Sequence, residues 1–330
     1  MLRVGLLGAG RIGQVHAVNI AGNARSSLVA VSDVDQNAAT RLASTHSAEA
    51  RSSEQILADP DIDAVLIATS TDTHSDLIEA AARAGKAVLC EKPVDLSLER
   101  ARRCLSSVAD TGVPIMIGFN RRFDPNFATL KASMSRGEIG NPELLSLTSF
   151  DPAPPPLAYI KVSGGLFRDM MIHDFDMANF LMGETPVAVR AVGSSVVNPE
   201  IGAAGDVDTA VVTLTYADGR IAVIKNSRRA VYGYDQRVEV LGSDGLLQAG
   251  NMLENTVVRS TADGVVSGKP TYFFLERYMP AYAAEWEAFL AATLDGSDIP
   301  VTLQDGITAL AMAEAATESA RTGQAVAMEE

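Results

Sequence analysis

Short apolar runs alternate with helix-like segments over the first third of the chain, and this alternation constrains the fold more than any other feature. Five runs are almost continuously apolar: LRVGLL, LVAVS, AVLIAT, AVLCE and PIMIGF. Strands that are apolar on both faces are typical of parallel sheets covered by helices. The segments between them, including Arg11–Gly22, Gln36–His46 and Thr73–Gly85, have the length and spacing of crossover helices. The sequence therefore predicts an α/β domain with a doubly wound parallel sheet.

The pattern changes after Phe119. A chain of 330 residues has the length of about two domains. From Pro186 to Phe274, strand-like runs are separated by turns at Asp218–Gly219 and Gly242–Gly245, which are typical of antiparallel hairpins. Two alanine-rich helices are expected to follow, at Met279–Leu294 and Leu303–Thr322. We therefore expect a first domain at 1–119 and a second, mixed α+β domain at 120–330.

The composition favours a protein that works on small molecules. The chain has 27 basic and 41 acidic residues, a net charge of −14, which disfavours binding to nucleic acids or to anionic membranes. Two cysteines are too few for a disulfide framework. No secretory signal and no membrane-spanning run are apparent in the sequence. The expected location is the cytoplasm.

Three glycines follow the first expected strand directly. Gly8, Gly10 and Gly13 form a G-x-G-x-x-G pattern, with Arg11 and Ile12 between the last two glycines. Glycines at these positions permit a tight turn and close approach of the backbone to a pyrophosphate, which the N-terminus of the next helix attracts. The pattern predicts a dinucleotide site in a Rossmann domain.

Asp33 ends the second strand, twenty residues after Gly13. A carboxylate at this position accepts hydrogen bonds from the ribose hydroxyls of an adenosine and repels a 2′-phosphate, so NAD is favoured over NADP. Two alternatives remain open. Asp35 competes for the ribose contact, and Asp33 alternatively caps the next helix.

Polar residues follow two later strands. Thr69 ends the AVLIAT run, and Ser70 and His74 follow it; Glu91 ends the AVLCE run, and Lys92 follows it. Ligands of open α/β sheets bind beyond the carboxyl ends of the strands. We expect these residues to contact the cofactor. The alternative for Lys92 is a surface cation paired with Glu91.

One segment of the second half collects ionisable groups. In GGLFRDMMIHDFDMANFL, expected to form one helix, Asp169 and His173 are four residues apart, and Asp176 lies three beyond His173. This spacing places the three side chains on one helix face. A solvated acid and histidine pair is the alternative. No metal site is expected, because neither a cysteine nor a second histidine lies near His173.

Together these motifs resemble the Gfo/Idh/MocA oxidoreductases, and within that family the inositol 2-dehydrogenases. The resemblance covers nearly the whole chain and rests on GAGRIGQVH at 8–16, EKP at 91–93, GFNRRFDP at 118–125, DMMIHDFD at 169–176 and YGYDQR at 232–237. It implies that Lys92, Asp169 and His173 are catalytic, with His173 as general base, and that Asn120, Arg121 and Tyr234 bind substrate beside them.

The resemblance also implies an activity and an assembly. The expected reaction is NAD-dependent oxidation of a secondary hydroxyl of a cyclitol, with myo-inositol and its 2-keto product as the leading pair. The alternatives are scyllo-inositol, another epimer, or an aldose at C1. A non-catalytic sugar sensor on the same fold is an alternative of another class. The implied second domain has an open, mainly antiparallel sheet that pairs subunits into dimers or tetramers.

Overall fold

The computed structural model describes residues 1–328 and divides into two compact units. The first unit comprises Met1–Phe123 and Ala281–Leu310, and the second comprises Asp124–Pro280 and the residues from Ala311 onward. The first unit thus extends four residues past the expected boundary at 119. It also contains thirty residues that the sequence analysis assigned to the second domain.

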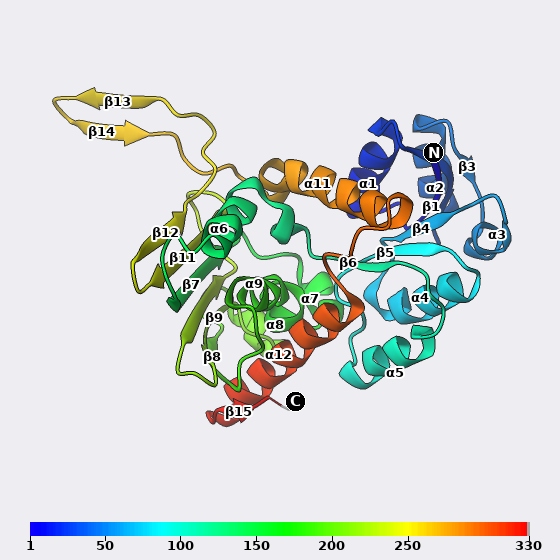
Figure 1. Ribbon diagram of the computed structural model, residues 1–330. Coiled ribbons are helices and arrows are strands. Elements are labelled where there is room, and N and C mark those ends of the chain that lie inside the picture. The colour runs from blue at the N-terminus through cyan, green and yellow to red at the C-terminus, as the bar shows by residue number, and fades with distance from the viewer. Residues whose placement is uncertain (329–330) are drawn as a thin grey trace. The chain divides into compact units, whose positions relative to one another are not determined.

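The first unit is built on a six-stranded parallel sheet of order β3-β2-β1-β4-β5-β6. This order, with the chain crossing over at β1, is that of a Rossmann domain. Figure 1 shows α4 and α5 on one side of the sheet and α1 on the other. The strands are β1 Leu2–Leu7, β2 Ser26–Ser32, β3 Glu49–Ala50, β4 Ala64–Ile67, β5 Ala87–Glu91 and β6 Ile115–Gly118.

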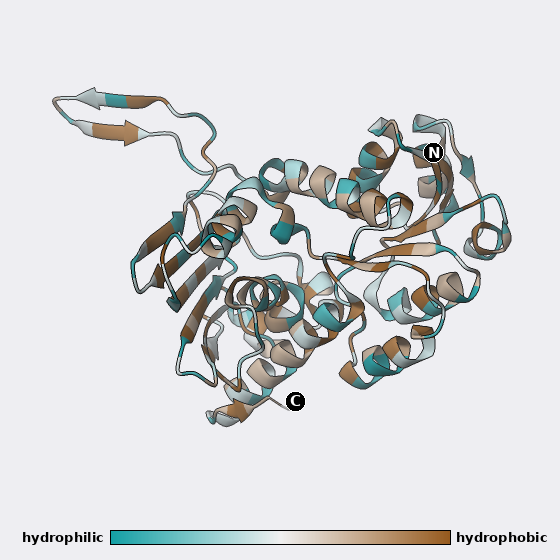
Figure 2. Ribbon diagram, in the orientation of Figure 1, coloured by the Kyte–Doolittle hydropathy of each residue, from teal (hydrophilic) through white to brown (hydrophobic). Residues whose placement is uncertain are grey.

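The expected strands of this unit are confirmed, because their apolar residues are buried on both faces. All four residues of β4 are buried, and β4 and β5 are largely hydrophobic in Figure 2. Three short or amphipathic elements were not expected: β3, α3 and α5. The helices are α1 Arg11–Gly22, α2 Gln36–Thr45, α3 Ser53–Ala58, α4 His74–Arg83 and α5 Leu98–Val108, with short 3₁₀ turns at Thr71–Thr73 (η1) and Asn120–Phe123 (η2).

The second unit contains a seven-stranded sheet of order β12-β11-β7-β10-β9-β8-β15. Only β10 and β7 pair in parallel; the other five neighbours are antiparallel. The two hairpins predicted from the turn sequences are present. The strands are β7 Pro142–Phe150, β8 Ala188–Ser194, β9 Thr209–Thr215, β10 Ile221–Ser227, β11 Asp235–Gly242, β12 Gly245–Ala249 and β15 Val326–Ala327.

Alternating burial along these strands leaves the sheet with one covered and one open face. In β10, Ala222 and Ile224 are buried, whereas Ile221 is exposed. A separate hairpin, β13 Val258–Thr261 with β14 Gly264–Ser267, projects from the unit (Figure 1). The helices of the unit are α6 Pro125–Ser135, α7 Leu157–Ser163, α8 Gly165–Asp169, α9 Ile172–Met182 and α10 Pro199–Ala203.

Two long helices carry the chain from one unit to the other and back. They are α11 Phe274–Leu294, which begins five residues before its expected start, and α12 Leu303–Thr322. Trp286 of α11 explains why the second half of this helix belongs to the first unit. Its ring is buried, and its Nε1 donates to Ser26 Oγ of β2 over 3.1 Å. The second half of α11 is therefore held against the first sheet by a buried aromatic side chain whose N–H group has a hydrogen-bond acceptor there.

None of the helices in residues 1–328 is long and apolar enough to cross a membrane.

The two cysteines, Cys90 and Cys104, are both buried and form no disulfide bond. Burial raises the pKa of the Cys104 thiol to about 11, so this side chain stays protonated at neutral pH.

Candidate active site

The three glycines of the turn after β1 differ in their surroundings. Gly8 has φ +104°, and a Cβ there would lie 2.3 Å from the carbonyl oxygen of Ala68. A Cβ on Gly13 would lie 2.0 Å from the Gly8 carbonyl oxygen, so this glycine lets α1 pack against the turn. A Cβ on Gly10, the N-cap of α1, would meet nothing within 4 Å. The open side of the turn is therefore at the helix N-terminus.

This N-terminus has the properties of a pyrophosphate cradle. No side chain caps α1, and its first turn, which contains Arg11 and Ile12, has no acidic residue. The first amide groups of a helix lack intrahelical partners and carry partial positive charge. The turn therefore fits the diphosphate of a dinucleotide at the place that the sequence predicted.

Asp33 is fixed against the glycine turn. Its Oδ2 accepts a hydrogen bond from the Ala9 amide over 2.6 Å, and its Oδ1 accepts one from the Asp35 amide over 2.8 Å. The helix-capping role belongs to Asp35, whose Oδ1 accepts from the Asn37 amide over 2.9 Å. The structure thus places the Asp33 carboxylate at the cofactor end of β2 and gives Asp35 a separate task.

The ends of β4 and β5 lie side by side, because Ile67 pairs with Cys90 in the parallel register. Thr69 and Ser70 follow β4, and the Thr69 hydroxyl is 2.7 Å from that of Thr73. Glu91 ends β5 and is followed by Lys92. All these residues therefore gather at the carboxyl edge of the first sheet, beside the glycine turn that follows β1.

His74, expected to contact the cofactor, lies at this edge with both ring nitrogens close to backbone carbonyl oxygens. The ring is buried, with Nδ1 2.8 Å from the Pro93 carbonyl oxygen and Nε2 3.2 Å from that of Thr69. Burial lowers the pKa of His74, so the ring is neutral at pH 7 and donates its proton across one of these contacts. Since both nitrogens face backbone carbonyls, His74 links the segments after β4 and β5.

The helix expected to carry both Asp169 and His173 is in fact two helices. Asp169 is the last residue of α8, His173 is the second residue of α9, and the buried Met170 and Met171 lie between. The expectation of one continuous helix face is therefore wrong. The break lies in the backbone, because the amides of Met170 and Met171 both donate to the Leu166 carbonyl oxygen, over 3.0 and 2.9 Å.

Asp169 is held by two groups that the sequence analysis did not identify. The Tyr159 hydroxyl donates to its Oδ1 over 2.8 Å, and Arg228 Nη2 lies 3.5 Å from its Oδ2. Arg228, only 1% exposed, also lies 3.8 Å from Asp206. Desolvation and the charge of Asp169 raise the pKa of Tyr159, so the hydroxyl keeps its proton and remains a donor. No local spacing reveals Arg228, because it is 59 residues from Asp169.

Neighbouring carboxylates on α9 have structural tasks. Asp174 is buried and accepts hydrogen bonds from the Ser149 hydroxyl over 2.6 Å and the Asn226 amide over 2.8 Å. Asp176, expected on the face of His173, is buried as well. His173 itself is partly exposed. Asp169 is partly exposed too, so these two ionisable groups are more accessible than Asp174 and Asp176.

The three expected substrate-binding residues are distributed over both units. Asn120 and Arg121 lie in the 3₁₀ turn η2 after β6, and both are buried in the first unit. Tyr234 belongs to the second unit, just before β11, with its ring edge-on to Tyr278 at 5.9 Å between centroids. Burial suits side chains that line a closed binding site, and it equally suits packing.

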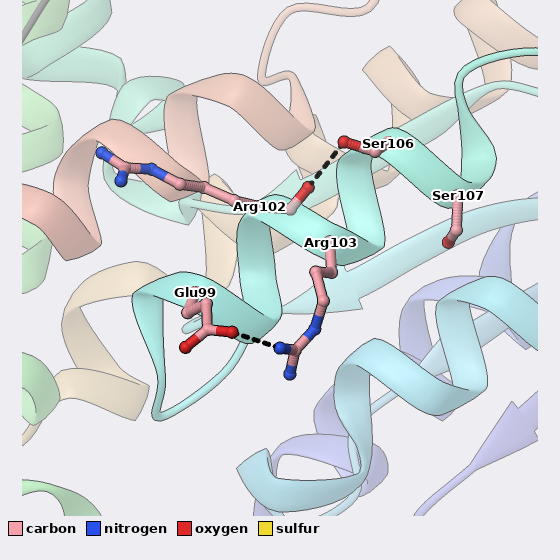
Figure 3. Close-up of a pocket in the computed structure, with 5 residues that line it drawn as sticks. All are labelled: Glu99, Arg102, Arg103, Ser106 and Ser107. Atoms are coloured by element: carbon pink, nitrogen blue, oxygen red, sulfur yellow. Dashed lines mark hydrogen bonds and ion pairs between the residues drawn. The ribbon is translucent and has the colours of Figure 1, made fainter.

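A hollow on the outer side of α5 is a separate surface feature (Figure 3). It is lined by residues of that helix alone, and an ion pair between Arg103 and Glu99 lies across it. None of the predicted site residues takes part. Its lining residues are Glu99, Arg102, Arg103, Ser106 and Ser107.

Comparison with known proteins defines the class. Residues 2–119 match the oxidoreductase family with NAD-binding Rossmann fold, and residues 131–328 match the C-terminal alpha/beta domain of the same family. The chain belongs to this family, the Gfo/Idh/MocA oxidoreductases. NAD is accordingly its cofactor, in agreement with the glycine turn and Asp33.

Individual relatives resemble the chain over almost its full length. An inositol 2-dehydrogenase of Rhizobium meliloti is 52% identical over 318 residues, covering 96% of each chain. A myo-inositol 2-dehydrogenase of Thermotoga maritima is 46% identical, covering 100% of this chain and 99% of its own. Among solved structures, that of a putative myo-inositol dehydrogenase from Sinorhizobium meliloti 1021 has a TM-score of 0.97 at 50% identity, with both chains covered fully.

Proposed function

We propose that this protein is an NAD-dependent dehydrogenase that oxidises a secondary hydroxyl of a cyclitol, with myo-inositol converted to its 2-keto product as the leading reaction. The observation that carries the proposal is the 52% identity over 96% of the chain to an inositol 2-dehydrogenase. The cofactor turn in the first unit supports it, as do Asp169 and His173, which lie on consecutive helices of the second.

The residues of the first unit fit the cofactor. We propose that the α1 N-terminus, with Gly8, Gly10 and Gly13, holds the pyrophosphate and that Asp33 receives the adenosine ribose. Thr69, Ser70, Glu91 and Lys92 would line the carboxyl edge next to it. Bound NAD supplies the acceptor for the hydride that leaves the substrate carbon.

The residues of the protein handle the proton and the developing charge. Neutral His173 accepts the proton of the substrate hydroxyl, because an imidazole titrates near neutral pH. Asp169, itself fixed by Tyr159 and Arg228, orients the imidazole and stabilises the imidazolium that forms. Lys92 donates a hydrogen bond to the reacting oxygen and stabilises its negative charge. Asn120, Arg121 and Tyr234 would bind the remaining hydroxyls.

A panel of polyols tests the proposal directly. Purified protein is mixed with NAD and about twenty cyclitols and sugars, NADH absorbance is followed, and kcat/KM ranks the substrates. We expect myo-inositol to rank first. If scyllo-inositol, another epimer or an aldose ranks higher, that compound is the preferred substrate and the assignment of myo-inositol is wrong. Absence of NADH formation across the panel would instead favour a non-catalytic sensor.

Asp33 should determine the choice of cofactor. The wild-type enzyme is expected to use NAD with a clear kcat/KM advantage over NADP, because the carboxylate repels a 2′-phosphate. Asp33→Ser should narrow that advantage by about tenfold or more, roughly one lost charge interaction. Steady-state kinetics with both cofactors measures the ratio, and Asp35→Ser is the matched control because Asp35 caps α2. If Asp35→Ser changes the ratio of kcat/KM for NAD and NADP more than Asp33→Ser does, Asp35 makes the ribose contact.

We also propose that subunits pair through the open face of the second sheet. Register places four exposed apolar side chains in one row across adjacent strands: Leu246, Leu241, Leu144 and Ile221. Val192 and Val211 form a second exposed pair. Apolar patches of this kind mark interaction surfaces, and closed homo-oligomers are the usual outcome. A homotetramer is the expected state. The cytoplasmic location stays a prediction.

Light scattering coupled to size exclusion tests this assembly. The wild-type protein is expected to elute well above the 34.8 kDa of one chain. Leu241→Asp, which puts a charge in the middle of the row, should shift the protein toward the monomer. Val231→Asp is the matched control, because Val231 is exposed in the loop before β11, outside the row. A monomeric wild-type protein would contradict the proposal.

A further inference from the structure

Three ionisable side chains from distant parts of the chain meet inside the first unit. They are His16 of α1, Glu91 at the end of β5 and Glu285 of α11, and their polar atoms all lie within 4.8 Å of one another. His16 is 1% exposed and Glu285 is 0% exposed. His16 Nε2 is 2.8 Å from Glu91 Oε1. We call these three residues the buried acid cluster.

The hydrogen-bonding capacity of the buried acid cluster is only partly used. Three of its polar atoms have no hydrogen-bond partner among residues 1–328: both carboxylate oxygens of Glu285 and the Nδ1 of His16. An ionised carboxylate that is buried without partners costs several kcal/mol, so such a group takes up a proton instead. Burial, together with the charge of Glu91, raises the pKa of Glu285 well above its ordinary value.

Tyr282, Gly118 and the chain neighbours of Glu91 adjoin the cluster. The Tyr282 ring, also from α11, packs edge-on against His16 with 5.5 Å between centroids. From β6, Gly118 makes room for Glu91, because a Cβ there would lie 3.2 Å from the Glu91 Cδ and Oε2. Cys90 precedes Glu91, with its thiol buried, and Lys92 follows it.

The position of the cluster connects it to the proposed chemistry. His16 lies one turn after Gly13 on the helix whose N-terminus forms the cofactor cradle, and Glu91 is bonded covalently to Lys92. A change in the Glu91 side chain therefore acts on the backbone that carries Lys92. Glu285 approaches both from α11, far along the chain.

We propose that Glu285 is protonated in the working enzyme and donates a hydrogen bond through one water to the Glu91 carboxylate, so that the buried acid cluster positions the Glu91-Lys92-Pro93 segment. Glu285 is thus a positioning residue that acts through Glu91. The positioning role rests on the proposed dehydrogenase function, whereas the protonation does not.

A divalent cation is the competing occupant. One imidazole and two carboxylates within 4.8 Å also form a donor set for such an ion. A cation requires both carboxylates to be ionised, whereas the shared proton requires one of them to be neutral. The two occupants therefore make opposite predictions for Glu285→Gln, which replaces a protonated carboxyl with a neutral side chain of the same shape that still donates a hydrogen bond.

The first test compares substitutions at Glu285 by steady-state kinetics. Glu285→Gln should keep kcat within about threefold of wild type. Glu285→Leu, which cannot donate, should lower kcat by about 10–100-fold with little change in KM, as expected for a misplaced catalytic group. Glu285→Met is the second apolar variant, used if the leucine variant does not fold. Equal losses for Gln and Leu, or no loss for either apolar variant, would overturn the proposal.

The second test reads the proton without using activity. Because the pKa of Glu285 is raised in the folded state, wild-type stability falls as pH rises above about 4.5, where the unfolded chain has already released this proton. Glu285→Gln lacks this loss. Its Tm minus the wild-type Tm should therefore increase as the pH rises above about 5.5, by up to about 2 °C per pH unit. A difference that does not change with pH contradicts the protonated state.

Metal analysis by plasma mass spectrometry completes the experiment. We expect no stoichiometric divalent metal in the wild-type protein as purified. If the wild-type protein instead carries about one metal ion per chain, and Glu285→Gln carries none, the cluster binds a cation and the proposal of a protonated Glu285 is wrong. If no polyol is oxidised by the wild-type protein, the proposed function fails, and the pH dependence of Tm still decides whether Glu285 holds a proton.

Discussion

His173→Ala is expected to lower kcat by about 10²–10⁴-fold, the usual contribution of a general base. Without the imidazole, no side chain accepts the hydroxyl proton as the hydride leaves. Affinity for NAD should stay near that of wild type, because the cofactor cradle lies in the first unit and His173 lies on α9 of the second. The measurements are kcat with the best substrate of the panel and NAD affinity by fluorescence titration.

The pH profile gives the same prediction an independent readout. Wild-type kcat should rise with pH through one ionisation near that of an imidazole, and this step should be absent from the residual activity of His173→Ala. His46→Ala is the matched control, because His46 lies at the C-terminal end of α2 outside the proposed site. An alanine variant that keeps most of its kcat, or that loses NAD affinity in proportion, would make His173 a structural residue.

Asp124→Ala is expected to destabilise the protein by about 3–5 kcal/mol, the typical cost of breaking a buried ion pair from one side. Asp124 is 0% exposed, and it bonds the guanidinium of Arg277, which is buried too. It also caps α6 by accepting from the amides of Asn126 and Phe127 over 3.0 Å and 3.2 Å. Its removal leaves a buried cation without its carboxylate and a helix without its cap.

Chemical denaturation of wild type and variants measures this effect. Asp263→Ala, in the exposed turn between β13 and β14, is the control and should change stability by no more than about 0.5 kcal/mol. The double variant Asp124→Ala with Arg277→Met should recover part of the loss, because it no longer buries an uncompensated charge. A double variant that is less stable than Asp124→Ala would show that the guanidinium is not the source of the cost.

The sequence predicted those elements of the first unit that depend on a short, continuous sequence pattern. The apolar runs defined the long strands because a strand buried on both faces must be apolar throughout, and the G-x-G-x-x-G spacing located the cradle because only glycine permits its contacts. The two-residue strand β3 and the helix α5 were missed, since the first is too short for a pattern and the second carries many charges. The hairpins of the second unit were predictable from their turns.

Other features depend on contacts between distant residues, which no spacing encodes. Local spacing suggested one helix with Asp169 and His173 on the same face, but the structure breaks it at Met170 and Met171, whose amides both donate to the Leu166 carbonyl oxygen. The partner of Asp169, Arg228, comes from the end of β10.

The sequence by itself determined the long strands, the hairpin turns, the cofactor turn and the identity of the candidate catalytic residues, because these features are specified by neighbours within a few positions. Only the tertiary structure decided which distant groups control those residues. The return of Ala281–Leu310 to the first unit buries Trp286 against Ser26 and brings Glu285 to His16 and Glu91. Burial and pairing at such separations are set by the packing of the whole unit, and they in turn set which buried acid holds a proton.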